Sequence, residues 1–141
     1  MTIDINTDRQ LLEVLYRVAH YCATYCSEWL GKYDVTLPQM ALLYIVFEAD
    51  NKDLCQKDIV DELKVKGSSI TSMINTMSKN GLLERKSCET DSRKYIIKGT
   101  EKGRRILNNI IKDSINNKID IFKNLDVSEK KQLLNLLFKI Y

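Results

Sequence analysis

Apolar residues recur at spacings of three and four along the first part of the chain, which is the pattern of an amphipathic helix. The first stripe predicts a helix over about residues 8–31, where Gly31 is expected to end it; its members are Leu11, Leu15, Val18, Cys22, Tyr25 or Cys26, and Trp29. Thr36 can cap a second helix, with Pro38 near its first turn and polar residues 50–53 at its end. The apolar residues of that helix are Met40, Leu43, Tyr44 and Phe47.

Two shorter helices are expected next, over about residues 56–63 and 69–80, with a tight turn at residues 65–68 between them. Gly81 is placed to close the second of them as a left-handed cap. One face of this helix is apolar (Ile70, Ile74, Met77), and the other carries Ser69, Ser72, Asn75, Thr76 and Lys79. Small polar residues with a lysine leave that outer face free to approach base edges and phosphates. A merely structural amphipathic helix would explain the inner face but not the hairpin that follows.

That hairpin is predicted by two strand-like runs, residues 83–86 and 95–98, on either side of a polar stretch that contains Asp91, Ser92 and Arg93. A helix followed by a strand, a charged hairpin tip and a second strand is the order of a winged helix-turn-helix. The helix of such a unit enters the major groove of DNA, and an arginine at the tip can enter the narrow, electronegative minor groove. DNA binding is therefore the leading interpretation.

Two further helices are expected at the end of the chain. Thr100 can cap a long one that runs to about Asn117, with the stripe Ile106, Ile110 or Ile111, Ile115, Ile119 and Phe122. Ser128 can cap the last, which carries Leu133, Leu136 or Leu137, and Ile140. The fold class is thus mainly α with a small antiparallel β-wing, in a single domain over residues 1–141. Residues 36–99 form the DNA-binding region, and residues 8–31 and 100–141 form a helical region for dimerisation, unless these ends simply cover the core.

Composition adds little beyond the distribution of charge. The 141 residues carry a net charge of +3, but residues 56–105 hold twelve Lys and Arg against seven Asp and Glu, an excess of five. Cations are concentrated where phosphates would be neutralised, although an ordinary solvated surface can show the same asymmetry. The longest apolar run, residues 41–47, is too short to span a bilayer, and the first four residues lack the features of a signal peptide. A cytoplasmic protein is expected.

The candidate DNA-binding residues come from the second short helix, the turn before it and the hairpin. Ser69, Thr71, Ser72 and Asn75 are expected near the major groove, and Lys66 and Lys79 on phosphates. The whole candidate set is Lys66, Ser68, Ser69, Thr71, Ser72, Asn75, Lys79, Arg85, Arg93 and Lys94.

Several local motifs, in this order and spacing, resemble the MarR family of bacterial transcription regulators, over about residues 11–140. They are Leu37-Pro38-Gln39, Ser68-Ser69-Ile70-Thr71, Asn80-Gly81-Leu82-Leu83, Asp91-Ser92-Arg93 and Thr100-Glu101-Lys102-Gly103. The resemblance implies a six-helix homodimer paired through its first, fifth and sixth helices, which binds a pseudo-palindromic operator on double-stranded DNA. It also implies that Arg93 is the minor-groove arginine, that Asp91 braces the wing, and that a small molecule or an oxidant releases a repressor from DNA.

The chain departs from the family pattern at three places. Ser72 and Thr76 stand where recognition helices of the family often carry arginines, so base readout is expected to be weaker or differently specified. These two residues also favour an alternative function, a winged-helix protein-interaction module with weak or non-specific DNA binding. Gly99 stands where a leucine usually precedes the threonine of the fifth helix, which removes an apolar anchor and is expected to loosen the joint with the wing. The hydroperoxide-sensing branch of the family has its reactive cysteine near the position of Leu12, so the sensing cysteine is absent from this chain.

The sequence gives no sign of an enzyme, a cofactor or a metal. No residue has the context of a catalytic nucleophile, and no Gly-rich phosphate loop is present. The cysteines Cys22, Cys26, Cys55 and Cys88 are expected to be reduced, the first two as small buried residues rather than ligands and Cys88 as the most exposed thiol. Whether any of them is redox-active is left open. An effector cavity is an alternative to plain core packing for five residues of the first two helices: His20, Trp29, Tyr33, Met40 and Tyr44.

Overall fold

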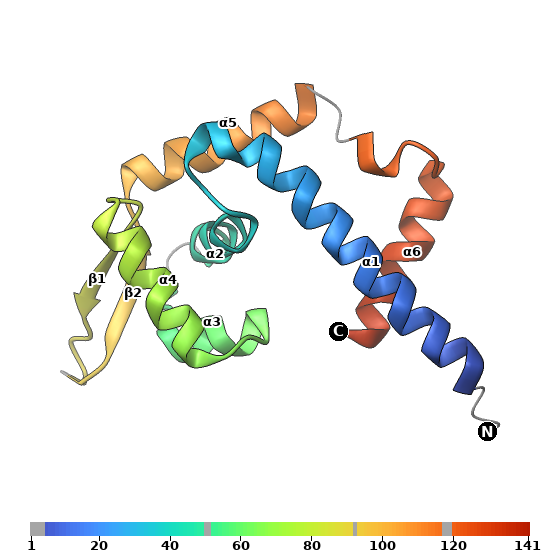
Figure 1. Cartoon of the computed structure of the whole chain (residues 1–141). Helices are drawn as coiled ribbons and strands as arrows, with labels where there is room; N and C mark the ends of the chain where they lie inside the picture. The colour runs from blue at the N-terminus through green and yellow to red at the C-terminus, as the bar shows by residue number, and fades with distance from the viewer. Residues whose placement is uncertain (1–4, 50–51, 92, 117–119) are drawn as a thin grey trace. The chain divides into compact units, whose positions relative to one another are not determined.

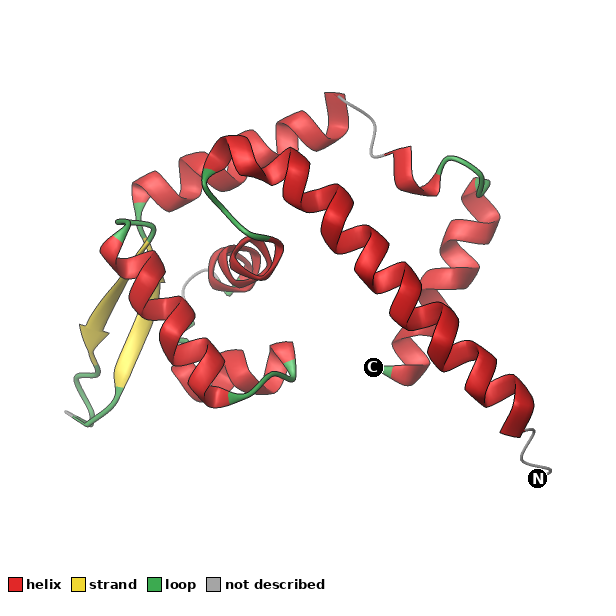
Figure 2. Ribbon diagram, viewed as in Figure 1, coloured by secondary structure: helices red, strands yellow, loops and turns green. Residues whose placement is uncertain are grey.

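The computed structural model describes residues 5–49, 52–91, 93–116 and 120–141 as six helices, two short 3₁₀ turns and one hairpin (Figures 1 and 2). The elements, in order, are α1 (Ile5–Leu30), η1 (Gly31–Tyr33), α2 (Leu37–Glu48), α3 (Gln56–Leu63), α4 (Gly67–Lys79), β1 (Leu83–Ser87), β2 (Tyr95–Gly99), α5 (Glu101–Asn116), η2 (Asp120–Phe122) and α6 (Val127–Ile140). They fall into two compact units, one of residues 26–111 and one of residues 1–25 with 112–141. The expected fold class, mainly α with a small antiparallel wing, is confirmed.

Local sequence signals explain several of the boundaries in residues 26–111. Thr36 begins α2 with a capping box, because its hydroxyl accepts from the Gln39 amide while the Gln39 side chain accepts from the Thr36 amide. Gly81 follows α4 with a φ of 72°, the left-handed conformation that a glycine adopts without strain. The Thr100 hydroxyl accepts from the Gly103 amide at the start of α5 and donates to the Gly81 carbonyl at 2.6 Å, which ties α5 to the end of α4.

Three expected boundaries were wrong or imprecise. The helix α6 begins at Val127 and is capped by Asp126, not by Ser128, because Asp126 forms a reciprocal capping box with Glu129. The helix α4 begins at Gly67, two residues before the position expected. Phe122 belongs to the turn η2 rather than to the stripe of α5, and Ile119 of that stripe lies outside the described residues.

The wing is a two-stranded antiparallel sheet whose register pairs Leu83 with Gly99 and Ser87 with Tyr95. A short segment before α3 extends the sheet on the other side of β2, since the Ile97 amide donates to the Leu54 carbonyl at 2.8 Å and Cys55 forms a bridge with Ile96. The sequence pattern did not predict that residues 54–55 pair with β2. This pairing holds the start of α3 against the wing.

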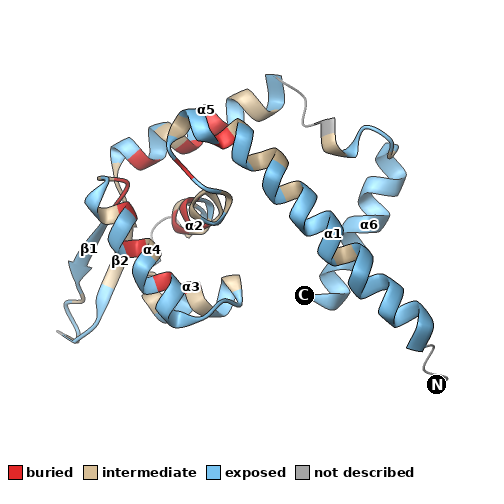
Figure 3. Cartoon of the chain, in the orientation of Figure 1, coloured by how far each residue is buried: buried red, intermediate tan, exposed pale blue. Residues whose placement is uncertain are grey.

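The hydrophobic core lies within residues 26–111. Fourteen hydrophobic residues are buried, contributed by every α-helix and strand of this unit and by the segments that join them. They are Leu30, Val35, Leu42, Leu43, Val46, Ile59, Ile70, Ile74, Met77, Leu82, Leu83, Ile97, Leu107 and Ile110. In Figure 3 the buried segments follow α2, α4 and α5, around which the unit is built.

Gly99 and Gly103 are both places of close approach within this unit. A Cβ on Gly99 would overlap the ring of Phe47, and a Cβ on Gly103 would overlap the carbonyl of Leu82. Phe47 from α2 therefore supplies an apolar contact at position 99. The loosening of this joint stays a prediction. The ring stands in the space that a side chain at position 99 would need.

The second unit has a different surface. No residue of α6 is buried, and of the part of α1 in this unit only Leu15, Cys22 and Tyr25 are half-buried. The exposed side chains of α6 include Leu134, Phe138 and Ile140, at 53%, 68% and 71%. Among the described residues, no helix combines the length and the hydrophobicity needed to cross a membrane.

Candidate nucleic-acid interface

The helix α4 has one buried face and one exposed polar face. Ile70, Ile74 and Met77 are fully buried, which confirms the inner face that the sequence pattern predicted. The outer residues are exposed: Ser68, Ser69, Ser72, Asn75, Thr76 and Lys79. Their hydroxyl and amide groups can donate and accept, as the edges of DNA bases require, while a lysine ammonium suits a phosphate.

Thr71 differs from the other polar residues of α4. Its hydroxyl donates to the Gly67 carbonyl at 3.0 Å and accepts from the Gln56 side-chain amide at 2.6 Å. The hydroxyl proton is therefore used within the first turn of α4, and the hydroxyl oxygen joins this turn to the first turn of α3. Thr71 is nevertheless exposed and lines the basic recess described below, so its contact with DNA stays a prediction.

Lys66 and Lys79 stand at opposite ends of α4, and both are exposed. Lys66 is the N-cap residue, makes no side-chain cap hydrogen bond and adds its charge to the positive end of the helix dipole. Lys79 is in the last turn. Cations at both ends of one helix can contact phosphates on the two sides of the groove that the helix enters.

Asp91 organises the tip of the wing around Arg93. Its carboxylate Oδ1 accepts from the Arg93 backbone amide at 3.1 Å and lies 3.5 Å from Arg93 Nε, while its carbonyl accepts from the Lys94 amide at 2.9 Å. The Arg93 side chain is 91% exposed, so the ion pair itself contributes little stability. The carboxylate instead shapes the turn and leaves the guanidinium group projecting into solvent. Ser92 lies outside the described residues.

A basic recess of about 480 Å³ lies between the start of α3, α4 and the wing. Four cationic residues line it, together with polar and apolar ones: Lys57, Arg85, Arg93 and Lys94, with Cys55, Gln56, Thr71, Tyr95 and Ile97. Four of these residues were predicted from the sequence (Arg85, Arg93, Lys94, Thr71), whereas Lys57, Gln56 and Tyr95 were not. Nothing in the local pattern marked these three, because only the pairing of residues 54–55 with β2 brings the start of α3 to the wing.

A second groove, of about 540 Å³, runs between the start of α2 and the outer face of α4. It is lined by Thr36, Pro38, Gln39, Ser68, Ser69, Ser72, Met73 and Thr76. The predicted residues Ser68, Ser69 and Ser72 thus share a surface with the capping box of α2. This groove is polar but uncharged, in contrast with the basic recess on the other side of α4.

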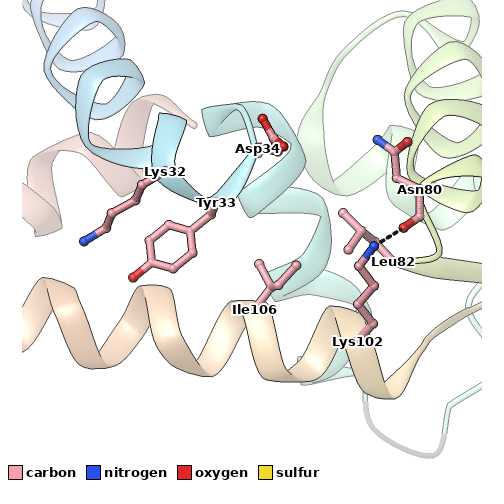
Figure 4. Close-up of a pocket in the computed structure, with 7 residues that line it drawn as sticks. All are labelled: Lys32, Tyr33, Asp34, Asn80, Leu82, Lys102 and Ile106. Atoms are coloured by element: carbon pink, nitrogen blue, oxygen red, sulfur yellow. Dashed lines mark hydrogen bonds between the residues drawn. The ribbon is translucent and has the colours of Figure 1, made fainter.

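A third pocket, of about 570 Å³, lies beside η1, at the opposite end of α4 from Lys66 (Figure 4). It is lined by Lys32, Tyr33, Asp34, Asn80, Leu82, Lys102 and Ile106, and Lys102 donates to the Asn80 carbonyl at 2.8 Å. Of the five residues considered for an effector cavity, Tyr33 alone lines this pocket. Trp29 and Met40 pack against the core, and Tyr44 and His20 are exposed.

All four cysteines are half-buried, including Cys22 and Cys26, which were expected to be buried. A hydrogen bond with the Thr90 hydroxyl, at 3.2 Å from Cys88 Sγ, lowers the pKa of the Cys88 thiol below its ordinary value. The pKa of Asp58 is also lowered, because its carboxylate accepts hydrogen bonds from Cys55 at the start of α3. Within the described residues, no three His, Cys, Asp or Glu side chains are grouped to hold a metal ion.

Comparisons with known proteins agree with this geometry. The model of the transcriptional regulator family SarA/Rot matches residues 24–110, which is nearly the whole unit that holds the core, α4 and the wing. The organic hydroperoxide resistance transcriptional regulator of Bacillus subtilis is 29% identical over 99 residues, covering 70% of this chain and 66% of that protein. The chain spans between about half and two thirds of the length of the curated relatives it matches.

Two solved structures share the fold. A mutant of MarR from Escherichia coli, in complex with operator DNA, superposes with a TM-score of 0.85 at 22% identity over 99% of both chains. The Staphylococcus aureus MepR–DNA complex has a TM-score of 0.77 at 18% identity, over 90% of this chain and 91% of that one. The resemblance to MarR proteins is thereby confirmed. Because the family model covers well over half of the chain, this protein belongs to the SarA/Rot family of transcriptional regulators, which are not enzymes.

Proposed function

We propose that this regulator binds double-stranded DNA as a homodimer, with α4 in the major groove and Arg93 in the adjacent minor groove. The observation that carries the proposal is the exposure of both groups on the unit of residues 26–111, where the basic recess lies between them. A protein that reaches two neighbouring grooves must straddle one sugar–phosphate strand. The other three cations of the recess, Lys57, Arg85 and Lys94, are suited to contacts with the phosphates of that strand.

The contacts then divide by chemistry. Ser69, Ser72 and Asn75 face base edges, with Ser68 beside them, and set sequence preference. Lys66, Lys79, Arg85 and Lys94 neutralise phosphates and supply affinity that depends on salt but little on sequence. Asp91 holds the wing turn so that Arg93 is presented to the minor groove.

Homodimerisation is proposed from the exposed apolar side chains of α1 and α6. Pairing of the chain ends would hold two copies of α4 at a fixed spacing, which suits a pseudo-palindromic operator with half-sites about one helical turn apart. A regulator bound in this way represses when its operator overlaps a promoter. We propose the pocket beside Tyr33 as the place where a small molecule acts to release the DNA; charged side chains (Lys32, Asp34, Lys102) and apolar ones (Leu82, Ile106) line it together.

Arg93→Ala tests the proposal most directly. With a duplex selected from a random pool, the substitution should weaken binding by about 1–3 kcal/mol and leave the fold intact. Arg9→Ala, which removes the same charge from the exposed surface of α1, is the matched control and should change affinity little. Unchanged affinity of Arg93→Ala in an anisotropy titration at matched salt would rule out the minor-groove role.

A second pair of variants separates base readout from phosphate contact. Asn75→Ala should change which sequences are selected, while Lys79→Ala should weaken all sequences alike and reduce the slope of log affinity against log salt by about 1. If Asn75→Ala also acts uniformly on every sequence, that residue does not read bases.

The alternative function is a protein-interaction module that keeps the winged fold. It is favoured by Ser72 and Thr76, which give the exposed face of α4 no cation between Lys66 and Lys79. The salt titration distinguishes the two functions, because binding through several phosphates must weaken steeply as salt rises. Weak binding to all duplexes, without a preferred sequence in the selection, would favour the alternative.

A further inference from the structure

The base of the wing contains a contact that the proposed DNA-binding role does not use. Gly99 is the last residue of β2, and a Cβ at this position would overlap the outer edge of the Phe47 ring. The glycine is not required by a left-handed backbone, since it is not among the positive-φ residues of the described chain. What distinguishes the position is space, because the outer edge of the Phe47 ring occupies the place of a Cβ, and one of the two must move if a side chain is added.

The same ring also contacts α5. The guanidinium carbon of Arg104, in the first turn of α5, lies 4.6 Å from the centroid of the Phe47 ring, a distance typical of a cation–π interaction. Phe47 itself comes from the last turn of α2 and packs against the core. One side chain of α2 therefore touches the end of the wing with its edge and α5 with its face.

We propose that Phe47 is a positioning residue that sets the angle of the wing relative to α2 and α5, and through it the placement of Arg93. This inference rests on the proposed DNA binding only for its functional consequence. Gly99 pairs with Leu83 at the foot of the hairpin, so a displacement at Gly99 turns both strands together. Arg93 lies six residues before Gly99 in the chain. From Gly99 to Tyr95 the strand β2 spans about 13 Å, and the turn and the arginine side chain extend beyond it, so the guanidinium group lies on the order of 20 Å from Gly99.

The length of this lever makes the wing tip sensitive to its base. A rotation of about 5° at Gly99 displaces a point about 20 Å away by nearly 2 Å. A hydrogen bond is lost over such a displacement, because its donor–acceptor distance tolerates only a few tenths of an ångström. A change in the contact of Phe47 with Gly99 or Arg104 would thus change the position of Arg93 relative to the minor groove.

The test uses the full chain and first measures the wing without DNA. Residual dipolar couplings of the backbone amides of β1 and β2 report the orientation of the hairpin relative to α2 and the first turns of α5. Gly99→Ala should rotate the couplings of the hairpin as one body, since its Cβ displaces the ring. Adding Phe47→Leu, which removes the outer edge of the ring, should return them toward their original values. Wing couplings that are the same in Gly99→Ala as in the unaltered protein overturn the inference.

Phe47→Leu alone covers the case in which Gly99→Ala fails to fold. It introduces no clash and removes the contact at Gly99, so the hairpin amides should show reduced couplings from a wider range of orientations, while those of α4 stay unchanged. Hairpin couplings that keep their full size in this variant overturn the inference as well.

A cycle of DNA affinities then measures the functional consequence. Arg93→Ala should weaken binding by about 10- to 100-fold in the unaltered protein but by less than about 2-fold in the Gly99→Ala background, because the tip has already left the groove. Lys79→Ala is the control and should cost the same in both backgrounds, because α4 keeps its place when only the wing is displaced. A rotated wing with no effect of Arg93→Ala in any background would support the positioning role and instead refute the proposed minor-groove contact.

Discussion

The two compact units of the chain differ in what they do with their apolar side chains. All fourteen buried hydrophobic residues of the described chain lie in residues 26–111. Of the large hydrophobic residues described as exposed, only Tyr44, Val65, Tyr95 and Ile111 belong to this unit, and the other seventeen belong to the unit of residues 1–25 and 112–141. The unit of residues 26–111 has a buried hydrophobic core. In the other unit the described helices are amphipathic, but their apolar side chains form no buried core.

This difference supports the proposal that the second unit associates with another chain. An exposed apolar surface of this extent is uncommon on a monomer and marks an interaction site. The SarA/Rot model matches residues 24–110 and so leaves most of this second unit outside it, whereas the fold shared with the MarR structure extends over 99% of both chains. The proposal of a homodimer through these ends follows from the contrast and is open to direct test.

The largest effect is expected from removal of α6. A chain that ends at Asp126 loses the exposed leucines of this helix, each of which contributes about 1.5–3 kcal/mol when fully buried in an interface. The shortened protein should sediment as a monomer or aggregate, and should lose cooperative binding to a two-half-site operator. Lys131→Ala in the full chain is the control and should remain dimeric. An unaltered dimer after truncation would place the interface outside α6.

A pair of leucine substitutions compares the two units, with smaller expected losses of stability than the truncation. Leu43→Ala, at a fully buried position of α2, should lower the free energy of unfolding by about 2–5 kcal/mol whatever the protein concentration. Leu134→Ala, at a position 53% exposed in α6, should act mainly through association, so its effect on the melting temperature should depend on protein concentration. Chemical denaturation at two concentrations measures both. An equally large, concentration-independent loss for Leu134→Ala would mean that α6 packs within its own chain.

The contrast also explains which parts of the fold could be predicted from the sequence. The predicted bounds of α3 and the cap at Gly81 were correct, because both depend on local sequence signals. These signals are the spacing of apolar residues in a helix and a glycine where the backbone needs a positive φ. The cap of α6 was assigned to Ser128 because a hydroxyl at that point is a common signal, but the reciprocal bonds of Asp126 and Glu129 start the helix earlier. Asp126 and Ser128 are both suitable N-cap residues, and the sequence alone does not show which of them forms the capping hydrogen bonds.

Contacts between residues that are far apart in the sequence have no such local signal. The meeting of Phe47 with Gly99, and of Gln56 with Thr71, depends on how α2, α3 and the wing pack together. The sequence therefore predicted neither the ring of Phe47 at Gly99 nor the hydrogen bond between Gln56 and Thr71. The exposed candidates on α4 and the wing were easier to predict, because amphipathic spacing already separates the outer face of a helix from its core.

The capping boxes of α2 and α6 offer a finer comparison of the units. Thr36→Ala should cost about 1 kcal/mol of unfolding free energy, because it leaves the Gln39 amide without its partner at the start of a core helix. Asp126→Ala removes the same kind of bond from a helix with no buried residue. It should lower the hydrogen-exchange protection of the first turn of α6 and weaken the dimer, with less effect on unfolding of the core. Equal losses of core stability in both variants would contradict the independence of the two units.

The smallest effect concerns the wing tip, the part of residues 26–111 that lies farthest from the core. The Thr90 hydroxyl lowers the pKa of the Cys88 thiol, so the thiolate persists to a lower pH than an ordinary cysteine allows. In a variant that keeps Cys88 as its one cysteine, the rate of alkylation by iodoacetamide should rise with pH around a midpoint below the ordinary thiol value. Thr90→Val, which keeps the shape of the side chain without the hydroxyl, should move the midpoint upward and leave the melting temperature unchanged. The same midpoint in both proteins would show that this hydrogen bond does not hold the hairpin tip in solution.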